Sequence, residues 1–74
     1  MSHLIIYGEK YYDDTKEYRW VTIPHSLAYK IKKSLMTEFE WRSIGIQMSQ
    51  GWQHSATLDE DNLGKSLLFG RLKI

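Results

Sequence analysis

The sequence must build its hydrophobic core from 74 residues without a single cysteine. A domain of this size lies near the lower limit for folding around one core, and neither disulfides nor thiolate-bound zinc can assist it. Three Trp, five Tyr and two Phe residues help, because a large ring buries more apolar area than an aliphatic side chain. We therefore expect a single domain over residues 1–74 with a stability on the order of a few kcal/mol.

The charge balance excludes several classes of protein. Ten Lys and Arg against nine Asp and Glu leave a net charge of +1, far from the basic surplus of a nucleic-acid binder. The run Lys30–Lys33 is interpreted first as a solvated helix face and second as a nucleic-acid or phospholipid patch. The apolar run Leu4–Tyr7 is too short for a membrane span or a signal peptide. With cysteine absent, we expect a soluble protein of the nucleus or cytoplasm that binds neither nucleic acid nor membranes.

The order of apolar and alternating patterns predicts two strands, two helices and two more strands. The expected elements are strands at His3–Tyr7 and Glu17–Ile23, helices at His25–Lys33 and Thr37–Ile44, and strands at Trp52–Leu58 and Ser66–Lys73. Lys10–Tyr12 is a short extension of the first strand. Two hairpins around a helical insert indicate an α+β fold, with a four-stranded antiparallel sheet and two short helices inserted between the second and third strands.

Local signals mark the ends of these elements. Pro24 suits the first position of a helix, because that position needs no N–H donor. Thr37 with Glu40 three residues later forms a capping-box pattern, and Gly45 is placed to end the second helix. Leu68, in the last strand, is a candidate core side chain.

The sequence contains no complete catalytic or metal-binding motif. Gly64-Lys65-Ser66 looks like the end of a P-loop, but Asp59 stands where that loop needs glycine. The three histidines lack metal-ligand spacing, and Ser49 and Ser55 near His54 lack a nucleophile-elbow pattern. We therefore expect no enzymatic activity, no metal and no cofactor.

Three stretches of the sequence resemble one known family. They are Glu17–Arg19, Leu35–His54 and Leu67–Arg71, and the matching residues near the start are Met1-Ser2-His3, Tyr7 and Lys10-Tyr11. These stretches are similar to the Cks family, the small regulatory subunits of cyclin-dependent kinases. The resemblance covers nearly the whole chain.

In that family a four-stranded sheet carries a pocket for a phosphorylated residue, usually phosphothreonine. The resemblance places the pocket's residues at Lys10, Arg19, Ser49, Trp52 and Arg71, and all five match in residue type. From the residues alone, Trp52 is equally a core ring, Arg19 and Arg71 are sheet-surface charges, and Ser49 is a loop cap. The resemblance is what joins them into one site.

The chemistry of such a site is coherent. A phosphate carries roughly −1.5 to −2 charges, which three cations balance, while a serine hydroxyl and an indole N–H add neutral donors. Charge-assisted hydrogen bonds of about 1.5 to 3 kcal/mol each, less the cost of ordering a peptide, predict micromolar affinity. Removing Arg71 should then abolish binding and change stability little, since the site is a cluster of like charges.

The sequence departs from the family between the last two strands. There the family carries a His-Glu-Pro-Glu-Pro-His hinge that supports strand exchange, whereas residues 57–66 here contain no proline and are two residues longer. Asn62 and Gly64 can supply the positive φ angles of a closed turn. We therefore predict a monomer with its last strand folded back, and expect no strand-swapped dimer. Gly70 also replaces a basic residue of the family.

The resemblance implies a non-catalytic adaptor of a cyclin-dependent kinase that binds phosphothreonine segments and promotes further phosphorylation. Candidate kinase contacts are Tyr7, Asp59, Glu60, Asp61 and Phe69. Because the hinge differs, the alternative is a phosphopeptide-binding module that no longer binds a kinase. A third hypothesis is a small interaction domain that binds no phosphate.

Overall fold

The computed structural model describes residues 5–60 and 64–73. The chain there forms β1 (Ile6–Tyr7), β2 (Tyr11–Tyr12), β3 (Lys16–Ile23), the 3-10 helix η1 (His25–Lys30), α1 (Glu38–Ile44), β4 (Gln53–Glu60) and β5 (Gly64–Leu72). This is the predicted α+β arrangement, with both helices between β3 and β4 and the expected extension forming β2. No helix in these two ranges has the length and apolar character needed to cross a membrane.

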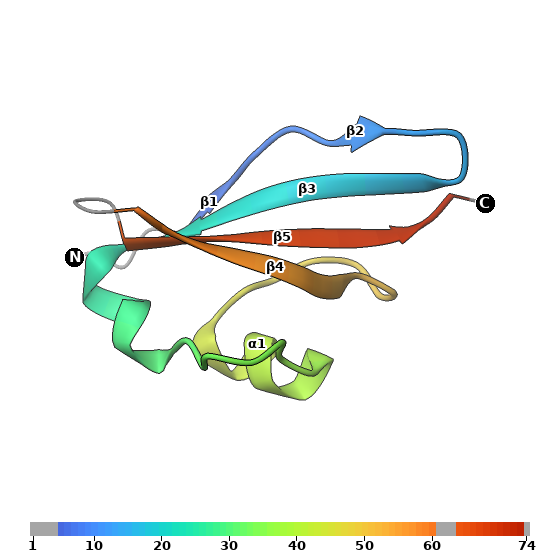
Figure 1. The fold of residues 1–74 in the computed structure, drawn as a ribbon. Coiled ribbons are helices and arrows are strands. Elements are labelled where there is room, and N and C mark those ends of the chain that lie inside the picture. Colours follow the sequence, from blue (N-terminus) through green and yellow to red (C-terminus); the bar gives the residue numbers. More distant parts are fainter. Residues whose placement is uncertain (1–4, 61–63, 74) are drawn as a thin grey trace.

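The sheet is antiparallel throughout. Its order is β1-β3-β5-β4, and β2 also pairs with β3. The last strand therefore lies between β3 and β4, as Figure 1 shows. Residues directly opposite each other in an antiparallel ladder share a face. On one face the register pairs Val21 with Leu67, Arg19 with Phe69, and Glu17 with Arg71.

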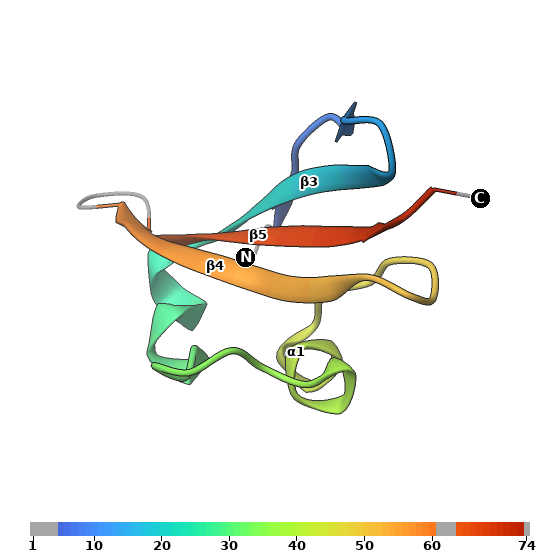
Figure 2. The same ribbon diagram turned by 45° about the vertical axis from the view of Figure 1, so that its right-hand side comes forward.

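The helices cover only this face of the sheet, as both Figure 1 and Figure 2 show. Between helices and sheet lies the core, made of Val21, Ile23, Leu27, Met36, Trp41, Ile46, Trp52, Leu67 and Phe69. At its centre the rings of Trp41 and Phe69 meet edge to face, with centroids 5.2 Å apart. Leu68 is only half-buried, because neighbours along a strand point to opposite faces. The core positions of β5 thus belong to Leu67 and Phe69, and not to Leu68.

The first predicted helix is shorter and tighter than expected. It is a 3-10 helix that ends at Lys30, three residues before the predicted Lys33, and Pro24 is its N-cap. No side chain caps its N-terminus and its first turn holds no acidic residue, so little favours a longer α-helix. Lys32, beyond the helix, instead pairs with Glu40 of α1.

The second predicted helix is confirmed, together with both of its end signals. The Thr37 hydroxyl accepts the Glu40 N–H at 3.3 Å, and the Glu40 carboxylate accepts the Thr37 N–H at 2.9 Å. At the other end Gly45 has a φ of 121° and donates its N–H to the Arg42 carbonyl. The capping box therefore fixes where the chain turns back beneath the sheet.

The hairpin of β4 and β5 closes within the chain. The ladder continues to the pair of Glu60 with Gly64, so the predicted strand ends at Leu58 and Ser66 are each two residues short. The reason is charge complementarity, since Asp59 and Lys65 face each other across the strands and form an ion pair. Gly64 has the predicted positive φ, at 103°. Asn62, the other residue expected to supply a positive φ, lies outside the described residues.

Candidate anion-binding site

The five candidate residues come from three parts of the chain, namely residues 10–19, residues 49–52 and β5, and converge at the edge of the core. Arg19 of β3 and Arg71 of β5 lie on the helix-covered face, next to the buried Val21 and Phe69 positions. Trp52 precedes β4, and Ser49 lies in the segment between α1 and β4. Trp52 is 2% exposed and belongs to the core, while both guanidinium groups approach its ring. It is thus both a core ring and the platform of the site.

Lys10 reaches this face because the pairing register changes between β1 and β2. Tyr7 pairs with Val21, whereas Tyr11 pairs with Tyr18, so one additional residue on the N-terminal side has no partner. With the β1 register Lys10 would lie opposite Tyr18, on the other face of the sheet. A shift of one residue reverses the face to which a side chain points. Lys10 Nζ consequently lies 3.8 Å from the carboxylate of Glu17.

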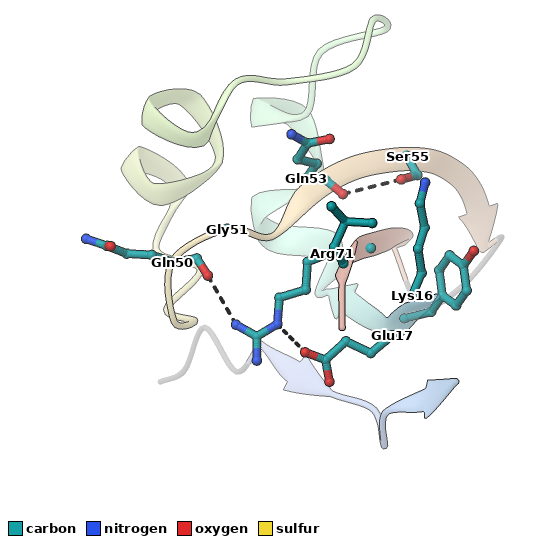
Figure 3. A pocket seen from close by; sticks show the side chains of 10 residues that line it. Lys16, Glu17, Gln50, Gly51, Gln53, Ser55 and Arg71 are labelled. Carbon is teal, nitrogen blue, oxygen red and sulfur yellow. Dashed lines mark hydrogen bonds and ion pairs between the residues drawn. The ribbon is translucent and has the colours of Figure 1, made fainter. Parts of the chain in front are cut away.

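Arg71 is the most connected residue of the site. Its Nη1 donates to Ser49 Oγ at 2.8 Å and to the Gln50 carbonyl at 3.1 Å, and its Nε donates to the Glu17 carboxylate. The centre of its guanidinium lies 4.5 Å from the centroid of Trp52, which is the geometry of a cation–π contact. Figure 3 shows Arg71 reaching from β5 between Gln50 and Glu17.

Arg19 contributes a second guanidinium with a free donor. Its centre lies 6.0 Å from the centroid of Trp52. Its Nε is buried and has no hydrogen-bond partner among the described residues. A buried donor without an acceptor is costly to the free protein.

Glu17 belongs to the site although sequence reasoning missed it. It is 9% exposed and forms ion pairs with both Arg71 and Lys10. The hydrogen bond from Arg71 lowers the pKa of the Glu17 carboxyl from its ordinary value, and the charges of Lys10 and Arg19 act in the same direction. The signal was present in the sequence, because Glu17 and Arg19 are two residues apart on one strand and so share a face.

Arg42 of α1 supports the segment that carries Ser49, and it too was not anticipated. Its Nη2 donates to the Met48 carbonyl at 2.8 Å and to the Ser49 carbonyl at 3.4 Å. Its guanidinium also lies 4.6 Å from the ring of Trp41. The side chain of Arg42 therefore links α1 to the segment that carries Ser49.

A groove adjoins the five-residue cluster on the side of β4. Its volume is about 740 Å³, and its lining includes Lys16, Glu17, Gln53, Ser55 and Arg71 (Figure 3). Of the five candidate residues and Glu17, only Glu17 and Arg71 line this groove. The site is therefore a surface between the sheet and the segment that joins α1 to β4, and the groove gives open space beside Glu17.

Comparison with known proteins decides the family. A family model described as "Cyclin-dependent kinase regulatory subunit" matches residues 5–73. The chain belongs to this family. The resemblance found in the sequence is thereby confirmed, and the matched range contains all five residues of the cluster.

Several proteins named as cyclin-dependent kinase regulatory subunits are similar to this chain. A Drosophila melanogaster protein named "Cyclin-dependent kinases regulatory subunit" is 54% identical over 55 residues, which cover 73% of this chain and 74% of that protein. A Physarum polycephalum protein named "Probable cyclin-dependent kinases regulatory subunit" is 55% identical over 53 residues, covering 70% and 63%. "Cyclin-dependent kinases regulatory subunit 2" of Arabidopsis thaliana is 49% identical over 53 residues, covering 70% and 64%.

The residues expected to contact a kinase in this regulatory subunit family lie in different environments. Tyr7 is 38% exposed, and its hydroxyl accepts the Gln47 N–H at 2.7 Å. Asp59 is exposed on β4, Glu60 ends that strand, and Asp61 lies outside the described residues. Phe69 is fully buried in the core and offers no surface to a partner, so we leave it out of the candidate contacts.

Among the described residues, no group of three or more His, Cys, Asp or Glu side chains is arranged to hold a metal ion. The chemistry available at the site is that of fixed charges and hydrogen-bond donors. Charged hydrogen-bond donors of this kind suit an anion as a ligand.

Proposed function

We propose that this family member is a non-catalytic adaptor of a cyclin-dependent kinase. In this proposal it holds a phosphothreonine segment of a substrate or regulator and so promotes further phosphorylation of the bound protein. The observation that carries the proposal is that Arg19 and Arg71 both approach the ring of Trp52. Ser49 is bonded to Arg71, and Lys10 joins the cluster through Glu17, which pairs with both Lys10 and Arg71.

The charge of the cluster supports a phosphate as the ligand. Lys10, Arg19 and Arg71 supply three positive charges, and Glu17 offsets one of them. The free site therefore has a surplus of two positive charges, and a phosphorylated side chain brings roughly −1.5 to −2 charges at neutral pH. A lone carboxylate matches this surplus less well. We therefore assign phosphothreonine, and not an unmodified acidic residue, as the preferred ligand.

Binding of this kind promotes phosphorylation through proximity. A substrate held by one phosphorylated residue presents its other target sites to the attached kinase at a high effective concentration. The kinase as partner is supported by the names of the family and of the relatives. Tyr7 and Asp59 are exposed candidates for that contact.

A second candidate function is a phosphopeptide-binding module that no longer binds a kinase. It is favoured by one observation, that residues 57–66 contain no proline and therefore differ from the family hinge. A pull-down with a cyclin-dependent kinase separates the two functions. Retention of this chain by the kinase supports the adaptor, whereas loss of kinase binding with phosphopeptide binding intact supports the module.

Phosphate recognition is tested by titrating the protein with a threonine peptide and its phosphothreonine counterpart, followed by amide chemical shifts. We expect saturable shifts at residues of the cluster with the phosphorylated peptide only. Lys10→Ala should weaken binding, whereas Lys33→Ala, which removes the same charge from an exposed position outside the site, should not. Equal shifts with both peptides would contradict the proposal.

A further inference from the structure

We propose that Glu17 is a built-in competitor of the incoming phosphate, which makes the site accept a dianion and reject singly charged carboxylates. This inference rests on the phosphate-binding function proposed above. It concerns an acidic residue at the centre of a cationic site, where an acid opposes the binding of any anion.

The position of Glu17 makes it a competitor and not a bystander. Its pairing with Arg71 across β3 and β5 puts the two side chains directly opposite each other on one face of the sheet. One carboxylate oxygen accepts from Arg71 Nε, and the other lies 3.8 Å from Lys10 Nζ. The carboxylate thus occupies two of the three cations that a phosphate would use.

The donors of Arg71 are largely engaged before a ligand arrives. A guanidinium has five N–H groups. In Arg71 the Nε donates to Glu17, and Nη1 donates to Ser49 and to the Gln50 carbonyl. Only Nη2 makes no hydrogen bond within the described part of the chain. Recognition of two phosphate oxygens by the arginine fork therefore requires Glu17 or the loop to release a donor.

Exchange of one anion for another explains the selectivity. When a carboxylate of a partner replaces Glu17, one negative charge replaces another and the electrostatic energy changes little. A phosphate brings about twice the charge and three acceptor oxygens, so it gains more from the same cations than Glu17 loses.

The displaced side chain has a place to go. Glu17 lines the open groove of about 740 Å³ beside β4, together with Lys16. Figure 3 shows Glu17 at the side of this groove, with the Lys16 side chain directed away from the Glu17 carboxylate. A rotation of the Glu17 side chain into this groove frees Arg71 and Lys10 without a change in the backbone.

The experiment compares Glu17→Gln with the unsubstituted protein. Three peptides of one neutral sequence are used, with threonine, phosphothreonine or glutamate at the central position, and binding is followed by amide chemical shifts. Glutamine keeps the size of the side chain and removes its charge. We expect the variant to bind the phosphothreonine peptide roughly tenfold more tightly, because the competing charge is gone. We also expect it to bind the glutamate peptide, which the unsubstituted protein does not.

Asp14→Asn is the matched control. It removes the same charge from an exposed position with no ion pair or hydrogen bond among residues 5–60 and 64–73, so the three affinities should stay unchanged. If net charge alone controlled binding, Glu17→Gln and Asp14→Asn would change the peptide affinities by the same amount. The same spectra show whether each variant is folded.

Three other outcomes count against the inference. If Glu17→Gln binds the phosphothreonine peptide no better than the unsubstituted protein, or more weakly, Glu17 positions Arg71 and does not compete. If the variant gains phosphopeptide affinity but still ignores the glutamate peptide, the proposed selectivity is wrong. If neither protein binds the phosphothreonine peptide, both this inference and the proposed function fail.

Discussion

The backbone N–H of Met36 donates to Nδ1 of His54 at 2.9 Å, which ties the segment before α1 to the sheet. The other ring nitrogen, Nε2, lies 2.7 Å from Thr57 Oγ1 and 3.1 Å from the Ala56 carbonyl. Since Nδ1 accepts, Nε2 carries the proton and the ring is neutral. Burial of His54 lowers its pKa below the ordinary 6.5, because the charged form loses hydration.

Stability should therefore fall as the medium becomes mildly acidic. The unfolded chain takes up a proton at His54 near pH 6.5, while the folded chain resists it, so the contribution is complete above that pH and is lost below it. Urea unfolding between about pH 8 and pH 5 measures the effect. The carboxyls of Asp13, Glu17 and Glu40 do not contribute to the change in this pH range, because their pKa values are lowered from ordinary values of 3.8 or 4.5.

Two histidine variants identify the group responsible. His54→Gln should flatten the pH dependence whatever it does to stability at neutral pH. His25→Gln, at an exposed position, should leave the dependence intact. If the pH dependence of stability persists in His54→Gln, another titratable group causes it.

The two faces of β5 should respond differently to truncation. Leu67 is fully buried in the core, whereas Leu68 is half-buried on the face without helices. Leu67→Ala should lower the free energy of unfolding by about 2 to 5 kcal/mol, and Leu68→Ala by clearly less. Chemical denaturation of both variants measures this difference, and equal losses would show that the open face is also packed in solution.

Arg71→Ala should abolish phosphopeptide binding and also destabilise the free protein. The second effect revises the expectation from the sequence, which treated the site as like charges only. The structure pairs Arg71 with Glu17, so removal of the arginine leaves a carboxylate of 9% exposure with its stronger partner missing. Adding Glu17→Gln to Arg71→Ala should restore part of the lost stability, while an additive loss in the double variant would argue against this coupling.

Gly64 should be the glycine least tolerant of substitution. Both Gly64 and Gly51 have positive φ angles, of 103° and 96°. A Cβ at Gly64 would lie 2.0 Å from the Ile23 carbonyl oxygen, whereas the contact nearest to one at Gly51 is Arg71 Cδ at 4.0 Å. Gly51→Ala should cost about 1 to 2 kcal/mol of backbone strain, and Gly64→Ala substantially more, as judged by thermal unfolding.

The protein should be a monomer in solution. β5 finds partners on both sides, β3 and β4, within its own chain, and the hairpin between β4 and β5 is closed. Light scattering at high protein concentration should give the mass of one 8.8 kDa chain. A stable dimer would revive strand exchange, and insertion of the family's proline-containing hinge in place of residues 57–66 should favour such a dimer.

Local chemistry made much of the fold predictable. The hydroxyl of Thr37, the carboxylate of Glu40 and the freedom of Gly45 bound α1 through contacts within a few residues, and each acts as the sequence indicated. The identity of the five site residues also followed from the sequence, through resemblance to a family. What the local pattern misjudged was length, since η1 ends early and the ladder of β4 and β5 extends past Asp59 and Lys65.

The sequence by itself determined the order of the strands and helices, the ends of α1 and the residue types of the cluster, because these depend on neighbours along the chain. Only the tertiary structure decided that the last strand lies centrally, that Lys10 turns to the face of the site, and that Glu17 sits among the cations. Those features depend on pairing between residues 7 to 54 positions apart, and a pattern of side chains along one strand does not specify which strand, or which register, it meets.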